Sequence, residues 1–164
     1  RRELCAWDAI GHDLDFAPAR IMSLNNIYVR WFEPSDLMNG GAAALLCDEA
    51  DLRKPCKSAR SGEVSWKCGA AREISGFALW WAAELVEGLW LATGPLDPRT
   101  HWEQLYMPLL TKVRVKAGET LAFRFRSVTS QEAGTDISWS IAHLDAGGRA
   151  IGRQSLALEK GFLP

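Results

Sequence analysis

The chain has 164 residues, 48% of them hydrophobic, and carries 19 Lys and Arg against 20 Asp and Glu, for a formal net charge of −1 at pH 7. This balance argues against nucleic acid or an anionic membrane as a partner, because both select clustered positive charge. No apolar stretch approaches the roughly 20 residues that a membrane-spanning helix needs. The length fits one domain, which we expect to cover residues 1–164.

The N-terminal third predicts one arm and few strands. Residues 17–27 place apolar side chains near helical spacing behind Pro18, which is typical of a short helical or irregular arm. The β-rich residues 28–32 stop at a proline and predict a short strand. The small apolar residues of 42–47 predict a buried strand.

Alternation of apolar and polar residues dominates the rest of the chain and predicts strands separated by Gly- and Pro-rich turns. Many short strands at such spacing are typical of a β-sandwich or β-barrel. We therefore expect an all-β fold, a β-barrel or sandwich of about 8–11 antiparallel strands, with a short helical arm inserted near the N-terminus. The strands expected here are residues 64–68, 76–85, 89–93, 104–110, 112–115, 121–125, 137–141 and 149–158.

The four cysteines, at positions 5, 47, 56 and 68, contain no C-x-x-C pair, so a zinc or thioredoxin-like site is not indicated. We interpret them as reduced thiols of a cytosolic protein, with a disulfide framework as the alternative. The chain begins with Arg1 rather than Met and has no apolar leader. We therefore expect a fragment, a processed product or a piece prepared for expression.

The motifs of complete enzymes are missing. The sequence has no G-x-G-x-x-G, Walker A, H-E-x-x-H or G-x-S-x-G pattern, so no cofactor loop is predicted. The three histidines, His12, His101 and His143, have no spacing that suggests a shared metal. We expect a packing role for His12 and a solvated position for His143.

One stretch carries a chemical signal, residues 93–104, which read T-G-P-L-D-P-R-T-H-W-E-Q. A loop stiffened by Gly-Pro and Asp-Pro leads into Thr100-His101-Trp102 directly before a strand, and would hold an imidazole and an indole at a fixed place. Such an imidazole can hydrogen-bond a catalytic carboxylate, and such an indole can pack against a substrate. The alternative is a core Trp102 beside a solvated His101.

In the order of its motifs, the sequence resembles the C-terminal β-barrel domain of the protein arginine N-methyltransferase family. The family's T-H-W loop is written here as Thr100-His101-Trp102. The other motifs that carry the resemblance, in chain order, are Trp7 with Ile10 and Gly11-His12-Asp13, residues 29–34, 76–81, 93–95, Gln104, Pro108, 115–121 and 136–141.

The resemblance implies half of an active site. In the family, S-adenosylmethionine and two catalytic glutamates belong to a preceding Rossmann-like domain, so none is expected to bind this chain alone. By this resemblance, His101 would be the catalytic residue that orients an acidic partner near the substrate guanidinium. Thr100 would fix the turn and Trp102 would pack against the substrate, a protein or peptide.

The resemblance also divides the chain. Residues 7–14 would form the barrel entry, 15–28 a dimerisation arm and 29–158 the barrel. The arm would dock on the donor domain of a second protomer and give a homodimer.

Two other readings stay open from the sequence. One is a stand-alone β-sandwich binding module, for instance one that stacks sugar rings on the 8 Trp. The other is a regulatory barrel that kept the fold and lost the enzyme.

Overall fold

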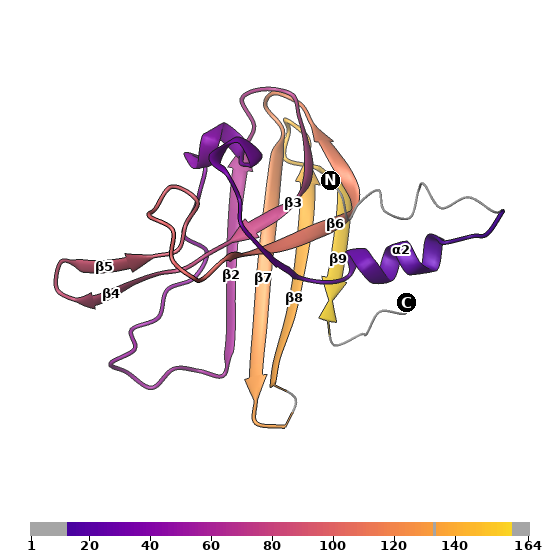
Figure 1. Cartoon of the computed structure of the whole chain (residues 1–164). Helices are drawn as coiled ribbons and strands as arrows, with labels where there is room; N and C mark the ends of the chain where they lie inside the picture. The colour runs from indigo at the N-terminus through magenta and orange to yellow at the C-terminus, as the bar shows by residue number, and fades with distance from the viewer. Residues whose placement is uncertain (1–12, 133, 159–164) are drawn as a thin grey trace. The chain divides into compact units, whose positions relative to one another are not determined.

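The computed structural model describes residues 13–132 and 134–158, which contain nine strands, one α-helix and two 3-10 turns. The predicted all-β class with one short helix near the N-terminus is confirmed (Figure 1). The chain forms two compact units. Unit 1 contains the described parts of Arg1–Asn26, Leu45–Ser75 and Leu109–Pro164, and unit 2 contains Ile27–Ala44 and Gly76–Pro108. Most of the expected barrel entry, residues 7–12, lies outside the described residues.

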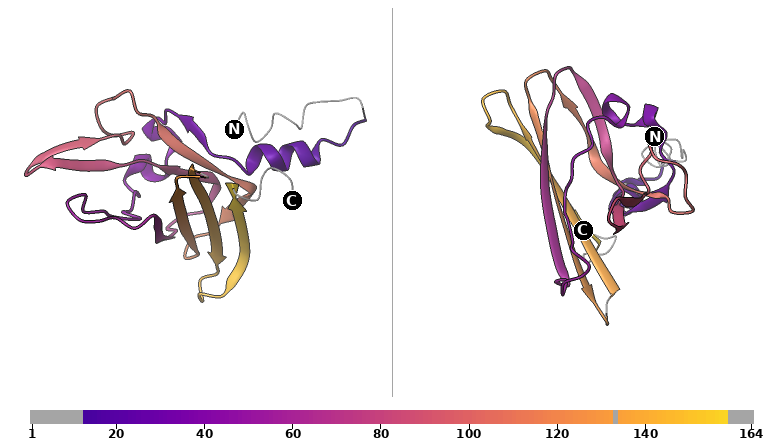
Figure 2. Two further views of the ribbon diagram at one scale, coloured as in Figure 1. Left: turned by 90° about the horizontal axis from the view of Figure 1, so that it is seen from below. Right: turned by 90° about the vertical axis from the view of Figure 1, so that its left-hand side faces the viewer.

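Unit 1 is built on a four-stranded antiparallel sheet in the order β2-β7-β8-β9. Figures 1 and 2 show these strands side by side as long ribbons. The apolar alternation that predicted the last strands places every second side chain on one face. The strands are β2 (Ala59–Lys67), β7 (Thr120–Ser130), β8 (Gly134–Leu144) and β9 (Ala150–Ala157).

The core of unit 1 lies against that face. Leu121, Phe123, Trp139 and Ile141 are all buried. Phe123 stands directly opposite Ile141 across the β7–β8 pair, so the buried side chains interlock between neighbouring strands.

A second sheet has the order β1-β6-β3, with β1 (Tyr28–Arg30) antiparallel to β6 (Gln104–Val115). Along the chain, β3 (Arg72–Leu79) and β6 each begin in one unit and end in the other. Unit 2 also contains a separate two-stranded hairpin and two 3-10 turns. These elements are β4 (Ala82–Val86), β5 (Leu89–Ala92), η1 (Pro34–Asp36) and η2 (Met38–Gly41).

The predicted buried strand at 42–47 is wrong. The chain turns at Asn39, Gly40 and Gly41, which all have positive φ, and Ala44 N–H then donates to the carbonyl of Gly41. Alanines have little preference for an extended backbone, and Leu46 beyond them is exposed. The run therefore leaves the turn as irregular chain.

Two strand boundaries also differ from the prediction. The expected strand 76–85 is interrupted at Trp80-Trp81, between β3 and β4. The expected strands 104–110 and 112–115 are one strand, β6, which continues through the buried Pro108. β1 pairs with β6 only as far as Tyr106, so its ladder ends before that proline.

The predicted arm is confirmed as a helix, α2 (Ala17–Leu24), with a proline in its first turn. Leu24 is buried. Asn25 then exchanges two hydrogen bonds with the backbone of Ala157, at 3.3 Å and 3.2 Å, and so ties the end of the helix to β9.

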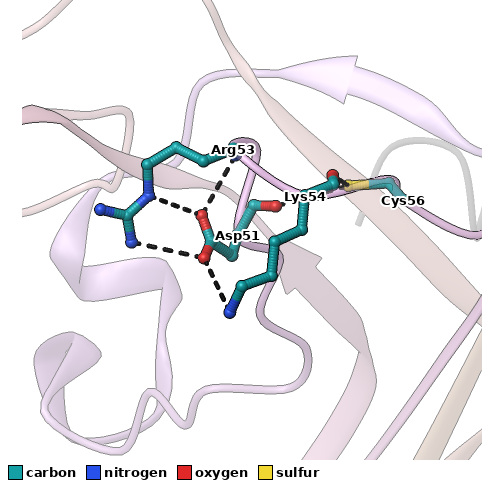
Figure 3. A network of polar contacts seen from close by, with 4 residues as sticks. All are labelled: Asp51, Arg53, Lys54 and Cys56. Atoms are coloured by element: carbon teal, nitrogen blue, oxygen red, sulfur yellow. Dashed lines mark hydrogen bonds and ion pairs between the residues drawn. The ribbon is translucent and has the colours of Figure 1, made fainter.

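The polar segment between η2 and β2 is irregular and folded by local contacts. Asp51 accepts hydrogen bonds from the backbone and guanidinium of Arg53 and forms an ion pair with Lys54 (Figure 3). The Cys56 thiol points back to the carbonyl of Lys54, at 3.6 Å. Cys56, Cys47 and Cys68 are free thiols, as predicted, and Cys5 lies outside the described residues.

His143 is not solvated, contrary to the prediction. It lies in β8, and its Nε2 is 2.6 Å from Oε2 of Glu119, with both side chains 12% exposed. The same carboxylate accepts the Lys116 backbone N–H at 2.8 Å. These bonds hold the pKa of Glu119 below its usual range. The bond to Lys116 closes the turn between β6 and β7, and the bond to His143 joins that turn to β8.

Candidate functional site

Residues 93–104, called here the T-H-W loop, lie in unit 2 between β5 and β6. A tight turn opens the loop. Asp97 N–H donates to the carbonyl of Gly94 at 3.1 Å, and Gly94 N–H donates to the Asp97 carboxylate at 3.1 Å. A side chain on Gly94 would place its Cβ 2.7 Å from Nε1 of Trp80, so only glycine fits this approach.

Thr93 fastens the first end of the T-H-W loop to Trp81. The Thr93 backbone N–H donates to the Trp81 carbonyl at 3.0 Å, and its hydroxyl donates to the same carbonyl at 3.0 Å. These bonds lie next to the Ala82–Ala92 pair and so continue the β4–β5 pairing as far as the break at Trp80-Trp81.

Gln104 fastens the second end, and it is 1% exposed. Its amide N–H donates to the Thr93 carbonyl at 2.7 Å, and its amide oxygen accepts the Phe32 backbone N–H at 2.9 Å. One buried side chain therefore satisfies two backbone groups and holds both ends of the loop together.

The three predicted site residues lie next to one another on the T-H-W loop. Thr100 Oγ1 accepts the Trp102 backbone N–H at 3.2 Å and lies 3.3 Å from the Trp102 carbonyl, which closes a local turn. The His101 ring lies against the Trp102 indole, with ring centroids 3.9 Å apart and planes tilted by 36°. His101 is exposed, and Trp102 is 41% exposed.

Trp102 also meets Trp81, edge to face, with centroids 5.4 Å apart and planes at 70°. This geometry is the favourable one for an aromatic pair. It does not offer the coplanar platform on which a sugar-stacking module would rely, so the pair does not favour the carbohydrate alternative.

Arg99, the residue before the T-H-W triplet, links the loop to the segment after β1. Its guanidinium forms an ion pair with Glu33 and lies over the ring of Trp31, 5.1 Å from the centroid. Glu33 also helps to cap η1, since Asp36 N–H bonds back to its carbonyl. The loop is thus held at both ends and at its middle, while its imidazole stays open to solvent.

The arrangement can present an imidazole that donates or accepts a hydrogen bond, backed by an aromatic wall. It does not assemble the parts of a reaction by itself, because the His101 ring contacts the Trp102 indole and the Asp97 carboxylate of the same loop accepts the Gly94 backbone N–H instead. Among residues 13–132 and 134–158, no group of three or more His, Cys, Asp or Glu is placed to hold a metal ion.

The described part of the chain also does not suit a nucleotide-type methyl donor. Such donors bind where a glycine-rich loop follows a parallel strand and opens a helix. The strand pairs of known register here are antiparallel, and α2 follows no described strand. Nor does any helix in the described ranges have the length and apolar character to cross a membrane.

The all-β scaffold with its short helical arm and the motifs of the T-H-W loop agree with the C-terminal barrel domain of the arginine methyltransferase family. The family model of the arginine methyltransferase oligomerization subdomain matches residues 1–143. The chain therefore belongs to this family.

Curated relatives agree in part of the chain. The Arginine N(omega)-methyltransferase of Streptomyces achromogenes subsp. streptozoticus is 36% identical over 76 residues, which are 46% of this chain and 21% of that protein. The Histone-arginine methyltransferase CARMER of Anopheles gambiae is 32% identical over 65 residues, 38% of this chain and 10% of that protein.

Solved structures share the fold over nearly the whole chain. The Trypanosoma brucei PRMT1 enzyme-prozyme heterotetrameric complex with AdoHcy superposes with a TM-score of 0.71 at 19% identity, covering 93% of this chain and 49% of that one. Arabidopsis thaliana protein arginine methyltransferase 10 gives 0.64 at 15% identity, covering 95% and 50%. The chain thus spans about half the length of the solved structures it matches.

The sequence missed three residues that build the site. Gln104 was recognised only as part of a motif, and its burial follows from contacts 11 and 72 residues away. Trp81 stands in the motif 76–81 and Arg99 directly before the T-H-W triplet, but no sequence pattern indicates the contacts that they make. Their partners, Trp102, Trp31 and Glu33, come together only through the folding of unit 2.

Proposed function

We propose that the chain is the barrel domain of an S-adenosylmethionine-dependent arginine methyltransferase and supplies the substrate-side wall of its active site. The observation that carries the proposal is the T-H-W loop, which exposes an imidazole lying against an indole while its ends are locked by Thr93 and Gln104. A rigid loop that presents an open polar ring positions a reacting partner at little entropic cost.

In this proposal His101 donates a hydrogen bond to an acidic group of the donor-binding domain. That acid then holds the substrate guanidinium, while Trp102 packs against the substrate and Thr100 fixes the turn between them. The methyl donor, when bound by the other domain, supplies an electrophilic sulfonium methyl. The residues of this chain orient the cation and narrow its access to water.

The partners of the chain belong to the same proposal. A Rossmann-like methyltransferase domain, not among the described residues, completes the site. Residues 15–28 dock α2 on that domain of a second protomer and give a homodimer. The family's description as an oligomerization subdomain and the heterotetrameric relative support assembly in general. The three free thiols support a reducing, cytoplasmic location.

The acceptor is an arginine guanidinium, since one relative is named for arginine and another for histone arginine. We propose a protein or peptide rather than the free amino acid.

The test is His101→Ala in the complete enzyme, with transfer of labelled methyl from S-adenosylmethionine to a peptide as the readout. Loss of a positioned polar group at the reacting centre is expected to lower kcat by about 100-fold, while the thermal unfolding midpoint stays the same because the ring is exposed.

His143→Gln is the matched control. It alters the buried pair with Glu119, so it is expected to lower stability and leave turnover unchanged. Equal turnover of the His101→Ala and parent enzymes would reject the site. Tight binding of S-adenosylmethionine to the isolated chain in calorimetry would reject the proposal that the donor binds to the other domain.

A further inference from the structure

We propose that the β4–β5 hairpin is a docking surface for the polypeptide that carries the substrate arginine, and that it recognises an apolar, basic segment beside that arginine. This inference rests on the proposed function, and it separates a polypeptide acceptor from free arginine. Neither the family match nor the relatives' names assign a role to the hairpin.

The hairpin presents more apolar surface than a solvated ribbon requires. Leu85, Val86, Leu89 and Trp90 are 59%, 63%, 56% and 61% exposed, and all four lie within six consecutive residues. Val86 and Leu89 are cross-strand partners and share one face, while Trp90 lies opposite Glu84 on the same strand pair. Apolar side chains gathered at one end of a ribbon in this way mark an interaction site rather than a scattered surface residue.

The hairpin is an isolated two-stranded sheet, and among the described strands β4 and β5 pair only with each other. Figure 1 shows it as a separate ribbon at one end of unit 2. A two-residue turn at Glu87-Gly88 closes it, with Gly88 at positive φ and its N–H donating to the Glu84 carboxylate at 2.9 Å. Two-stranded ribbons are marginally stable by themselves, so added contacts would stabilise this one.

The apolar surface is continuous with the T-H-W loop. Trp81, directly before β4, packs against Trp102, and Thr93, directly after β5, bonds to Trp81. Trp81 and Trp102 are both 41% exposed. From this base the hairpin extends five residues to its turn, roughly 16 Å at about 3.3 Å per residue. A chain held at the T-H-W loop can therefore reach the exposed leucines within about five extended residues.

The charge of the hairpin indicates which kind of partner it binds. Between Arg72 and Arg99 the sequence contains no Lys, Arg or His, while the hairpin carries Glu84 and Glu87. Two copies of such a hairpin would repel each other, which disfavours a second copy of this chain. A segment with apolar side chains and positive charge complements both features, and the substrate itself is cationic.

The test measures binding of two fluorescein-labelled peptides to the 164-residue chain by anisotropy. Both contain one arginine in a Gly-Ser context. In the first a Leu-Lys segment follows within five residues, and in the second Ser replaces every Leu and Lys of that segment. The first is expected to bind more tightly, by about tenfold, because only it buries the apolar surface.

The double variant Leu89→Ser with Trp90→Ser is expected to lose that advantage. Leu52→Ser is the matched control, since Leu52 is 82% exposed and lies in unit 1 away from the hairpin sequence. Glu87→Lys, at the exposed turn, tests the charge without touching packing and is expected to weaken binding of the first peptide by about threefold at low salt. If the double variant does not fold, the Glu87→Lys variant still tests the proposal.

Equal affinity of the parent and both hairpin variants for the first peptide would overturn the proposal. So would a self-association of the chain, measured by sedimentation, that disappears in the hairpin variants, because the occupant would then be a second copy. Hairpin-dependent binding without any methyl transfer by the complete enzyme would reject the proposed function and leave the docking surface standing. If the complete enzyme methylates peptide and free arginine at rates that the hairpin variants do not change, the docking surface is rejected and the proposed methyltransferase function stands.

Discussion

The four-stranded sheet of unit 1 and the T-H-W loop of unit 2 use tryptophan in opposite ways. Trp139 on β8 is 2% exposed, whereas Trp102 on the loop is 41% exposed and contacts the rings of His101 and, edge to face, Trp81. In the sheet the indole contributes to stability through buried area. On the T-H-W loop, hydrogen bonds to the backbone fix the loop's conformation, and the aromatic rings stay partly exposed and free to bind a partner. The difference indicates that stability and recognition are carried by separate parts of the chain.

Truncation of the two indoles tests this contrast directly. Trp139→Ala removes a fully packed ring and is expected to lower the free energy of unfolding by about 3–5 kcal/mol. Trp102→Ala is expected to cost roughly half as much, since 41% of its surface is already in solvent. Denaturant unfolding of both variants measures the difference. Similar losses from both would show that the loop tryptophan is part of the core.

Gln104→Ala tests whether the loop has a buried anchor of its own. The change leaves the Phe32 N–H and the Thr93 carbonyl unsatisfied, so we expect a loss of about 2–3 kcal/mol. Gln154→Ala is the matched control, because Gln154 likewise makes two hydrogen bonds to backbone groups, those of the exposed Thr111, but is itself only partly buried. Its expected loss is below about 1 kcal/mol. Equal losses would refute the role of burial.

Glu119 makes the stability of unit 1 depend on pH. Its pKa in the folded chain is lowered by the Lys116 N–H and by His143, whereas an unfolded glutamate titrates at about 4.3. The stabilisation is therefore complete above that value and is lost as the pH falls through the folded pKa. Glu119→Gln is expected to flatten the acid limb of the unfolding midpoint measured against pH. Glu132→Gln, at an exposed turn, is expected to leave it unchanged.

The smallest expected effect concerns the polar segment before β2. Arg60 donates two hydrogen bonds to the Asp48 carboxylate, at 2.6 Å and 2.7 Å, and both side chains are about one-third exposed. Arg53, in the network of Figure 3, is 90% exposed. Arg60→Ala is expected to lower the melting midpoint slightly and Arg53→Ala to leave it unmoved, because solvent screens exposed pairs. A larger drop for Arg53→Ala would contradict this order.

Sequence periodicity predicted the sheet of unit 1 well because its strands have one buried and one exposed face. The alternation of Leu121 and Phe123 with Ala122 and Arg124 is such a pattern. It failed at 42–47, an apolar run of alanine, leucine and cysteine without alternation, where the backbone of Asn39-Gly40-Gly41 turned the chain. It also failed at His143, because a partner 24 residues away removed the side chain from water.

The sequence predicted the three residues of the candidate site, but not the contacts that hold them in place. The residues Thr100, His101 and Trp102 are consecutive, and they lie on the chain between β5 and β6. The anchors could not be predicted, because Gln104 and Arg99 act through residues distant in sequence. The catalytic and substrate-binding roles of the triplet remain predictions for the complete enzyme. The expectation that residues 1–164 form a single domain also remains a prediction.

The sequence by itself determined the all-β class, the arm, the family and the loop that bears the imidazole, since these depend on local periodicity and on the order of short motifs. Only the tertiary structure decided which groups lock that loop, that Glu119 and His143 pair, and that the hairpin leaves its leucines and Trp90 in solvent. These features depend on contacts between residues far apart in the chain, and a pattern of neighbours along the sequence carries no information about which distant backbone a side chain will meet.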